Sequence, residues 1–162
     1  MKYIYYYTFP FCKIGIAEKG GAICNILINN DKSIKNLYDF VKSETQLIKK
    51  TAKELDEYFS GKRKVFDLPV TFHGTGFKVK VWESLHAIKY GETRSYKEVA
   101  ALLGNPKASR AVGMANKRNP VPIIVPCHRV IGHDGSLVGY SGGLELKEKL
   151  LNLEKRFNRV RK

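Results

Sequence analysis

A cysteine and a histidine, Cys127 and His128, stand side by side inside the apolar run 121–131. A thiol reacts as its thiolate, and at an ordinary pKa of about 8.5 only about 3% of it is ionised at neutral pH. An imidazole that accepts the thiol proton, or a cation such as Arg129, would therefore activate this cysteine. The alternative interpretation is an inert core pair, because cysteine is among the most buried residue types.

The backbone around the cysteine is predicted to be stiff. Four β-branched residues lie in 121–125. Pro122 and Pro126 cannot donate a hydrogen bond to a sheet, and each proline also restricts the backbone of the residue before it. The pattern predicts a short buried strand and turn that hold the thiol in dry surroundings. Neighbours in an extended segment point to opposite sides, so a water molecule would have to relay a proton from Cys127 to His128.

A carboxylate lies on the apolar face of the last predicted helix, 144–156. The inward stripe of this helix includes Lys147 and continues to Glu154. A buried carboxylate needs a partner, and His128 is the natural candidate. The alternative is a solvated Glu154 at a frayed helix end. The glycine-rich loop 132–143 precedes the helix, and such a loop can bring backbone N–H groups close to a planar ligand.

Two short helices upstream form a candidate helix-turn-helix. Ser95 and Glu98 make a capping box that opens the first helix, and Gly104 ends it. The second helix is predicted over 105–117, since its Asn-Pro start suits an N-cap and a first helical residue. The second helix would be the recognition helix, although any helical hairpin in a bundle gives a similar pattern.

The second of these helices is unusually slim and basic. An ordinary helix is about 10–12 Å across and the minor groove is only about 6 Å wide, so a helix that lies there needs small residues. Such a helix should bind DNA with little sequence preference, through phosphate contacts and shape. The alternative is that small residues only permit close helix packing. The residues expected to contact DNA are Lys107, Ala108, Ser109, Arg110, Ala111 and Gly113.

Composition favours a soluble protein with a polyanionic partner. The chain has 162 residues, 29 Lys and Arg against 15 Asp and Glu, and a formal net charge of +14. This excess suits nucleic acid, although a basic surface can also serve solubility or a membrane surface. No run approaches the roughly 18 apolar residues that span a bilayer, so we expect a cytosolic protein, or a nuclear one in a nucleated cell. Cys12, Cys24 and Cys127 are too scattered for a disulfide framework or a zinc motif, so we expect reduced thiols and no metal.

The first part of the chain predicts a small α/β domain. The runs 11–17 and 22–28, separated by a glycine pair, predict a hairpin. Apolar spacing from 33 to 59 predicts a helix. A boundary near Leu68 and Pro69 gives two domains, 1–68 and 69–162.

Three segments of the second domain carry a family resemblance. They are Asn-Pro-Val-Pro-Ile-Ile-Val-Pro-Cys-His-Arg-Val at 119–130, Arg-Ala-Val-Gly at 110–113 and Tyr-Ser-Gly-Gly at 140–143. Together they resemble the O6-alkylguanine-DNA alkyltransferases, also called methylated-DNA-protein-cysteine methyltransferases, from about Gly74 to Glu154. The resemblance implies a ribonuclease-H-like α/β domain, an antiparallel sheet with a helix, followed by a mainly α domain with the helix-turn-helix. Relatives with tryptophan in place of the reactive cysteine bind alkylated DNA without repairing it, whereas this chain keeps the cysteine.

The resemblance also implies catalytic roles. Cys127 would accept the alkyl group, His128 would act as its base through a water, and Glu154 would orient and charge His128. Tyr96 would donate a proton to the departing guanine oxygen. Asn119 would hold the loop around the cysteine.

Further roles follow from the same resemblance. Arg110 would enter the base stack where the damaged nucleotide has left. Backbone groups of Cys127, Val130 and Ser141 would read the guanine edges. Asn116 stands where the vertebrate version has a methionine, which bears on the tolerance of bulky alkyl groups. The pocket residues expected in this way are Val130, Tyr140, Ser141, Gly142, Lys147 and Asn116.

The implied reaction is the repair of double-stranded DNA, bound through its minor groove by a monomer without a cofactor. An alkyl group, such as methyl, moves from O6 of guanine or O4 of thymine to Cys127, and the resulting thioether has no ready hydrolysis route, so each molecule acts once. Two other classes stay open. One is a DNA-binding regulator that uses the helix-turn-helix alone, and the other is a cysteine hydrolase that uses Cys127, His128 and Glu154 on an acyl substrate.

Overall fold

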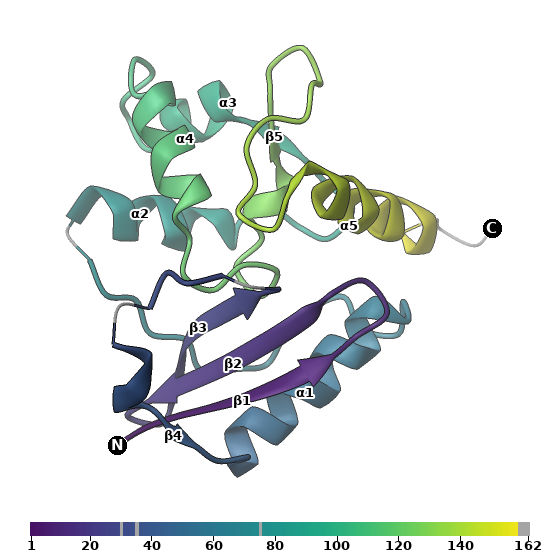
Figure 1. Ribbon diagram of the computed structural model, residues 1–162. Coiled ribbons are helices and arrows are strands. Elements are labelled where there is room, and N and C mark those ends of the chain that lie inside the picture. The colour runs from purple at the N-terminus through teal and green to yellow at the C-terminus, as the bar shows by residue number, and fades with distance from the viewer. Residues whose placement is uncertain (30, 35, 75, 159–162) are drawn as a thin grey trace. The chain divides into compact units, whose positions relative to one another are not determined.

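The computed structural model divides into two compact units (Figure 1). The first unit is Met1–Phe72 and the second is His73–Lys162. Among the residues described, no helix is long and apolar enough to cross a membrane. The structure describes residues 1–29, 31–34, 36–74 and 76–158.

The division between the units falls after Phe72, whereas the sequence places a boundary after Leu68. The residues in between lie along a strand of the first unit. The N–H of Ile23 donates to the carbonyl of Pro69 at 2.8 Å, and the N–H of Thr71 donates to the carbonyl of Ile23 at 2.9 Å. This pairing holds the segment to the first unit.

A four-stranded sheet in the order β3-β2-β1-β4 forms the first unit. The strands β1 (Lys2–Thr8), β2 (Lys13–Lys19) and β3 (Ala22–Ile28) are antiparallel neighbours, while the short β4 (Val41–Lys42) pairs parallel to β1. The sheet is therefore mixed and not purely antiparallel as predicted, because the chain crosses back after β3 and adds β4 at the β1 edge.

The predicted hairpin of β2 and β3 is confirmed. Its turn is formed by Gly20 and Gly21, whose φ angles are 61° and 80°. Glycine adopts such positive values at little steric cost, so this turn is encoded locally.

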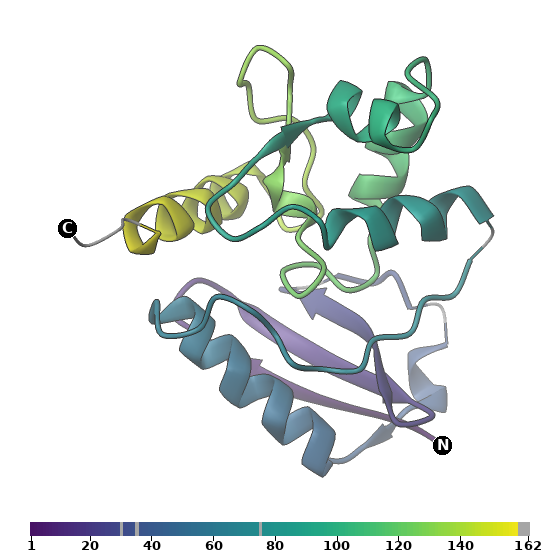
Figure 2. The same ribbon diagram turned by 180° about the vertical axis from the view of Figure 1, so that it is seen from behind.

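Helix α1 (Gln46–Phe59) covers one face of the sheet (Figures 1 and 2). The side chain of Thr45 caps it by accepting a hydrogen bond from the N–H of Ile48 at 3.1 Å. The helix predicted over 33–59 is therefore too long. A 3-10 turn at Leu37–Asp39 and strand β4 occupy its first part, because apolar residues spaced by three or four also suit a turn and an edge strand.

Helices dominate the second unit, as predicted. They are α2 (Gly76–Leu85), α3 (Tyr96–Leu102), α4 (Ser109–Lys117) and α5 (Leu144–Phe157). Two short parallel strands, β5 (Arg94–Ser95) and β6 (Val130–Ile131), pair with each other. Figure 2 shows these elements from behind.

The helix-turn-helix consists of α3 and α4, which pack against each other. The predicted capping box is confirmed, since Ser95 Oγ accepts from the N–H of Glu98 and Glu98 Oε1 accepts from the N–H of Ser95, both at 3.0 Å. Helix α4 begins at Ser109 and not at Pro106, the first helical residue predicted after an Asn105 N-cap. Asn105 instead starts a turn, because its carbonyl accepts from the N–H of Ala108 at 3.0 Å.

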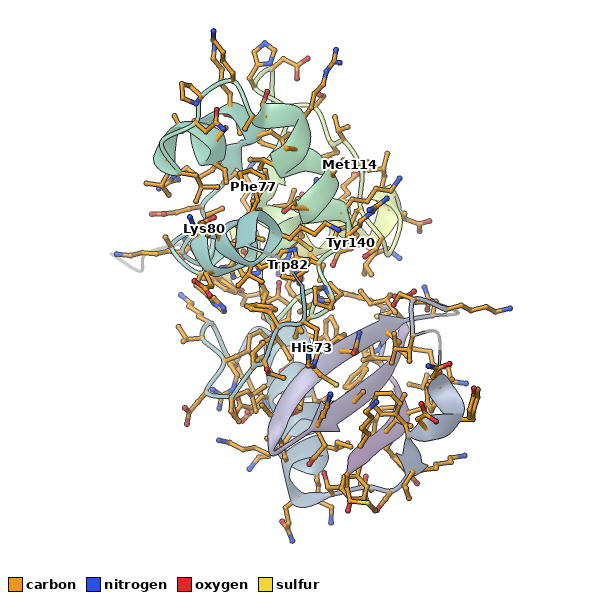
Figure 3. The ribbon with its side chains drawn as sticks, turned by 90° about the vertical axis from the view of Figure 1, so that its left-hand side faces the viewer. His73, Phe77, Lys80, Trp82, Met114 and Tyr140 are labelled. Atoms are coloured by element: carbon orange, nitrogen blue, oxygen red, sulfur yellow. The ribbon has the colours of Figure 1, made fainter. Side chains whose placement is uncertain are left out.

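Small residues on α4 permit close contacts inside this unit. A Cβ on Gly113 would lie 3.7 Å from the ring of Tyr96 on α3. On another side of α4, the indole N–H of Trp82 donates to the carbonyl of Ala115 at 2.8 Å (Figure 3). Packing therefore accounts for part of the slimness of α4, while Ala111 is exposed to solvent.

Candidate active site

The cysteine lies at the end of a proline-rich loop and not on a strand. Pro122 and Val125 form an isolated bridge, and the N–H of Val125 donates to the carbonyl of Val121 at 2.9 Å. The turn takes Ile123 to a φ of 74°, a value that is rare for a β-branched residue. The predicted strand is therefore wrong, and a 3-10 helix, η2 (Cys127–Arg129), carries the cysteine. The extended backbone from which we predicted a water relay between Cys127 and His128 is therefore also wrong, and the relay rests on the family resemblance.

Two buried amide side chains hold this loop. The Nδ2 of Asn119 donates to the carbonyl of Val125 at 2.8 Å, and its Oδ1 accepts from the N–H of Val121 at 2.9 Å. The Nδ2 of Asn116 donates to the carbonyl of Cys127 at 3.1 Å. These amides supply hydrogen bonds that a loop with two prolines cannot make with its own backbone.

The Cys127 thiol is enclosed, with 1% of the residue exposed. Burial raises the pKa of the thiol to about 11, while a hydrogen bond with Asn119 and the charge of Lys147 act in the opposite direction. At neutral pH the sulfur is therefore protonated, and its use as a nucleophile requires a base.

His128 and Glu154 form a buried pair, as predicted. The distance from His128 Nε2 to Glu154 Oε2 is 2.6 Å. Burial lowers the pKa of His128, and this effect outweighs the hydrogen bond and charge of Glu154, which raise it. Burial alone would raise the pKa of Glu154, but its bonds to His128 and Arg129 lower that pKa well below the usual range. The pair thus consists of a neutral imidazole and a carboxylate at pH 7.

Arg129 binds the same carboxylate. From the sequence we had suggested it as a cation that would activate the thiol of Cys127. Its Nε donates to Glu154 Oε1 at 2.8 Å and its Nη2 donates to Oε2 at 3.1 Å. Its Nη1 donates to the carbonyl of Ile88 at 2.7 Å, and the N–H of Gly91 donates to Glu154 Oε1 at 3.1 Å. Glu154 therefore joins three segments that are far apart in the sequence.

Lys147 is also fully buried, and its ammonium group binds backbone carbonyls. Its Nζ donates to the carbonyl of Val130 at 2.7 Å and to that of Val138 at 2.9 Å. The Tyr96 hydroxyl donates to the same Val138 carbonyl at 2.7 Å and lies 3.5 Å from Nζ. Burial lowers the pKa of Lys147 to about 8, while Cys127 acts to raise it. A cation and a phenol thus lie together near the thiol.

A cavity of about 460 Å³ opens between Tyr96, α4 and the loop that follows β6. Its lining residues are Tyr96, Ser109, Arg110, Gly113, Met114, Lys117, Val138 and Gly139. Two exposed apolar side chains, Met114 at 55% and Val138 at 50% exposure, border it. Figure 3 shows Met114 on α4 and Tyr140 in the loop.

Family models match both units. A model described as "6-O-methylguanine DNA methyltransferase, ribonuclease-like domain" matches residues 1–72, and one described as "6-O-methylguanine DNA methyltransferase, DNA binding domain" matches residues 76–156. The chain belongs to the 6-O-methylguanine DNA methyltransferase family. The fold predicted from the resemblance, an α/β domain and a helical domain, is confirmed.

Similar proteins cover between 80% and 96% of the chain. A methylated-DNA-protein-cysteine methyltransferase of Methanosarcina barkeri is 48% identical over 80% of this chain and 89% of its own length. A constitutive one of Bacillus subtilis is 44% identical over 93% and 95%. The crystal structure of Mycobacterium tuberculosis OGT in complex with DNA is similar with a TM-score of 0.88 and 39% identity, covering 96% of this chain and 94% of that one.

In this member of the methyltransferase family, the predicted site residues occupy two settings. Cys127, His128, Glu154 and Asn119 form one buried cluster, while Tyr96 reaches from α3 to the cavity. The residues predicted to contact DNA lie on α4 and in the turn before it, where Lys107, Arg110 and Ala111 are exposed and Ala108, Ser109 and Gly113 are half-buried. Of the predicted pocket residues, Asn116, Val130, Tyr140 and Lys147 are buried, Gly142 is half-buried and Ser141 is exposed.

Several residues at the cavity of this family member were not predicted as site residues from the sequence. Met114 and Lys117 follow Arg110 by four and seven residues, and this helical spacing is a signal that places them on one face. Val138 carries no comparable signal, because its role rests on a carbonyl that accepts from Tyr96 and Lys147.

Proposed function

We propose that the chain repairs DNA directly by moving an alkyl group, methyl in the simplest case, from O6 of guanine or O4 of thymine to Sγ of Cys127. The observation that carries this proposal is a buried thiol that directly precedes the buried His128–Glu154 pair in the chain, in the same unit as a cavity bordered by a basic helix. The names of relatives at 44% and 48% identity support the same reaction.

His128 is the proposed base. Its ring is neutral at pH 7, because burial lowers its pKa. Its Nε2 faces Glu154, so Nδ1 is the nitrogen that would receive the thiol proton through a water molecule. Glu154 would then stabilise the imidazolium that forms.

The thiolate would attack the alkyl carbon in line with the departing guanine oxygen. A carbon–sulfur bond forms, the carbon–oxygen bond breaks, and its electron pair goes to the guanine. Tyr96 would donate its hydroxyl proton to the base, and Lys147, with Nζ 3.5 Å from that hydroxyl, would replace the proton. The thioether product cannot be hydrolysed readily, so each molecule would act once.

Helix α4 is the element proposed to enter the minor groove of duplex DNA. The exposed Lys107 would contact phosphates, while Ala108, Ser109, Ala111 and Gly113 leave room for the groove walls. Residues 73–162 hold 17 Lys and Arg against 7 Asp and Glu, a net charge of +10, which supports binding of a polyanion by this unit. The damaged base would turn out of the stack into the cavity, and Arg110 would fill the gap.

We place Asn119 and Asn116 in this reaction as supports of the cysteine loop, and Val130, Tyr140, Ser141 and Gly142 as the residues around the extruded base. No cofactor is needed, since the base, the proton donor and the acceptor all belong to the chain. A monomer in the cytoplasm, or in the nucleus of a nucleated cell, would suffice for repair.

Duplex DNA that carries a radiolabelled methyl group on O6 of guanine tests this function. The expected result is label on the protein, up to one equivalent, located at Cys127 by peptide mass spectrometry. Cys127→Ser should take up no label yet bind DNA within a few fold of wild type. Cys24→Ser, at a second buried thiol, is the matched control and should react normally.

The alternatives give different outcomes in the same assay. A DNA-binding regulator would bind the duplex and leave the label on the DNA. A cysteine hydrolase would also leave the label on the DNA, and it would turn over an added ester substrate many times. Either result would overturn the proposed function.

A further inference from the structure

Arg129 and His128 share one carboxylate. The guanidinium of Arg129 meets both oxygens of Glu154, at 2.8 Å and 3.1 Å, and His128 meets one of them at 2.6 Å. All three side chains are buried, with exposures of 0% for His128, 8% for Arg129 and 1% for Glu154. In such surroundings a fork-shaped, two-point contact between guanidinium and carboxylate is strong, and little solvent screens its charge.

A second anchor keeps the guanidinium in this position. Its Nη1 donates to the carbonyl of Ile88 at 2.7 Å, and its centre lies 5.7 Å from the centroid of the Tyr90 ring. Arg129 is therefore held on two sides and cannot leave Glu154 without breaking a buried hydrogen bond. The carboxylate that orients His128 is thus one half of a fixed ion pair.

The charges around the imidazole favour its neutral form. On its own 3-10 helix, His128 adjoins Cys127, whose thiol is neutral, and Arg129, which is a cation. From α5 it faces the anion Glu154 and the cation Lys147. A protonated His128 would therefore be a third buried cation beside one carboxylate, which low-dielectric surroundings disfavour.

The remaining neighbours of the His128 imidazole do not offset the charge of these cations. Asn116 on α4 is uncharged, and it binds the carbonyl of Cys127. In the segment before β5, Tyr90 lies against Arg129, and burial raises its pKa, so it is neutral at pH 7. In the same segment, burial lowers the pKa of His86, and Arg129 lowers it further. Glu154 is therefore the anion that offsets the charge of the cations around His128.

We propose that Arg129 is a positioning residue for the alkyl transfer: by neutralising Glu154 it leaves His128 unprotonated, and so able to accept the thiol proton, at neutral pH. This inference rests on the proposed function for its consequence, because it assigns His128 the part of base. It differs from a purely structural role, in which Arg129 would only hold the three segments together.

The sign of the expected effect follows from the role of a base. A base works in its unprotonated form, so the transfer rate falls as the pH drops through the pKa of His128. Without the Arg129 cation, the full charge of Glu154 would stabilise the imidazolium, and this pKa would rise. The acid limb of the pH–rate profile would then move to higher pH.

Arg129→Gln and Arg129→Lys separate the two roles. We expect the acid limb of single-turnover alkyl transfer between pH 5 and 8 to move up by about one unit in Arg129→Gln, the size that a nearby charge typically causes. In Arg129→Lys, which keeps the charge but loses the fork, the limb should stay within a few tenths of a unit of wild type. A rate lowered equally at every pH, with the limb unmoved, would show that Arg129 is structural only.

Histidine NMR measures the same effect without DNA. The chain has 4 histidines, so the His128 ring signals can be assigned with a His128→Gln spectrum. In the wild-type protein they should be those of a neutral ring at pH 7, and a titration midpoint above pH 7 would overturn the inference even if Arg129→Gln does not fold. If wild type transfers no label while the NMR midpoints shift as expected, the proposed function fails and the charge relation stands.

Discussion

Two buried thiols of this chain show that burial alone does not make a nucleophile. Burial raises the pKa of both Cys12 and Cys127 to about 11. At Cys12 burial accounts for the shift, whereas at Cys127 the hydrogen bond of Asn119 and the charge of Lys147 oppose it. In the proposed reaction, the imidazole of the next residue adds a base. The proposed reactivity of Cys127 therefore comes from its neighbours.

Replacing Glu154 by Gln should destabilise the second unit strongly. The change leaves the buried Arg129 without its carboxylate, and breaking a buried ion pair in this way typically costs about 3–5 kcal/mol. Urea unfolding at pH 7 measures the loss. Glu145→Gln is the matched control on the same helix, because Glu145 is 87% exposed and pairs with Lys149 at 3.4 Å, and it should change the unfolding free energy by less than about 1 kcal/mol.

The stability provided by Glu154 should depend on pH in a defined direction. The pKa of this carboxyl is lowered in the folded protein, so its contribution is complete above the ordinary pKa of a glutamate and fades as the pH falls below that value. The difference between wild type and Glu154→Gln should therefore be smaller at pH 3 than at pH 7. A difference that grows toward acid pH would contradict the ion pair.

At the scale of the element, α4 combines a packed side with an exposed basic side that we propose binds DNA. Its buried side meets α2 and α3, while its exposed side carries Arg110, Met114 and Lys117. These three residues border the cavity. The slimness of the helix is thus explained in part by packing, and its exposed side is left for the proposed contact with DNA.

Arg110→Ala should slow repair of duplex DNA by about tenfold or more. Extruding a base costs a few kcal/mol, and a side chain inserted in the gap offsets part of that cost. Reaction with free O6-benzylguanine should be unchanged, because no base must leave a stack. Arg118→Ala removes the same charge at the other end of the helix and is the control. Equal duplex repair by Arg110→Ala and wild type would count against insertion.

Met114→Ala should weaken binding of duplex DNA by about fivefold to tenfold, because it removes roughly 1 kcal/mol of apolar contact. Met114 is 55% exposed at the cavity rim, where an apolar side chain can pack against sugars and base faces. Fluorescence anisotropy with a labelled duplex measures the effect. Leu102→Ala, at an equally apolar and 68% exposed position on α3 outside this cavity, should bind like wild type.

At the scale of the whole molecule, the charge is divided unevenly. The first 72 residues carry a net charge of +4 and the remainder +10. The polyanion partner therefore suits the second unit, which also holds the candidate active site. The first unit contributes an independent sheet and helix whose core includes Ile4, Ala17, Cys24 and Leu27.

Alkylation of Cys127 should lower the melting temperature of the protein by several degrees. Added carbon at a fully enclosed sulfur overpacks its surroundings, which typically costs about 1–3 kcal/mol, and each kcal/mol corresponds to about 2–8 °C. Thermal melts before and after complete reaction with O6-benzylguanine test this. Cys127→Ser treated with the same reagent should melt unchanged. A raised melting temperature after alkylation would show that the site accommodates the product without strain.

Signals within a few residues of one another were sufficient to predict much of this protein. The glycine pair at 20–21, the capping box of Ser95 and Glu98 and the inward place of Glu154 all follow from local spacing. The match of 119–130 to a family implied the fold, and the fold is confirmed. These features are local because a turn, a cap or a helix face is decided by residues one to four positions apart.

Tertiary structure decided the partners and the limits of the elements. The helix predicted over 33–59, the start of α4 and the strand before the cysteine were wrong, because competing turns and distant hydrogen bonds outweighed local preference. The carboxylate shared by Arg129 and His128 joins residues 25 and 26 positions apart, and its bond to Gly91 spans 63. The sequence determined which ionisable groups are present. Only the folded chain decided which buried charge each of them faces, because burial and distance set the electrostatic energy between two charges.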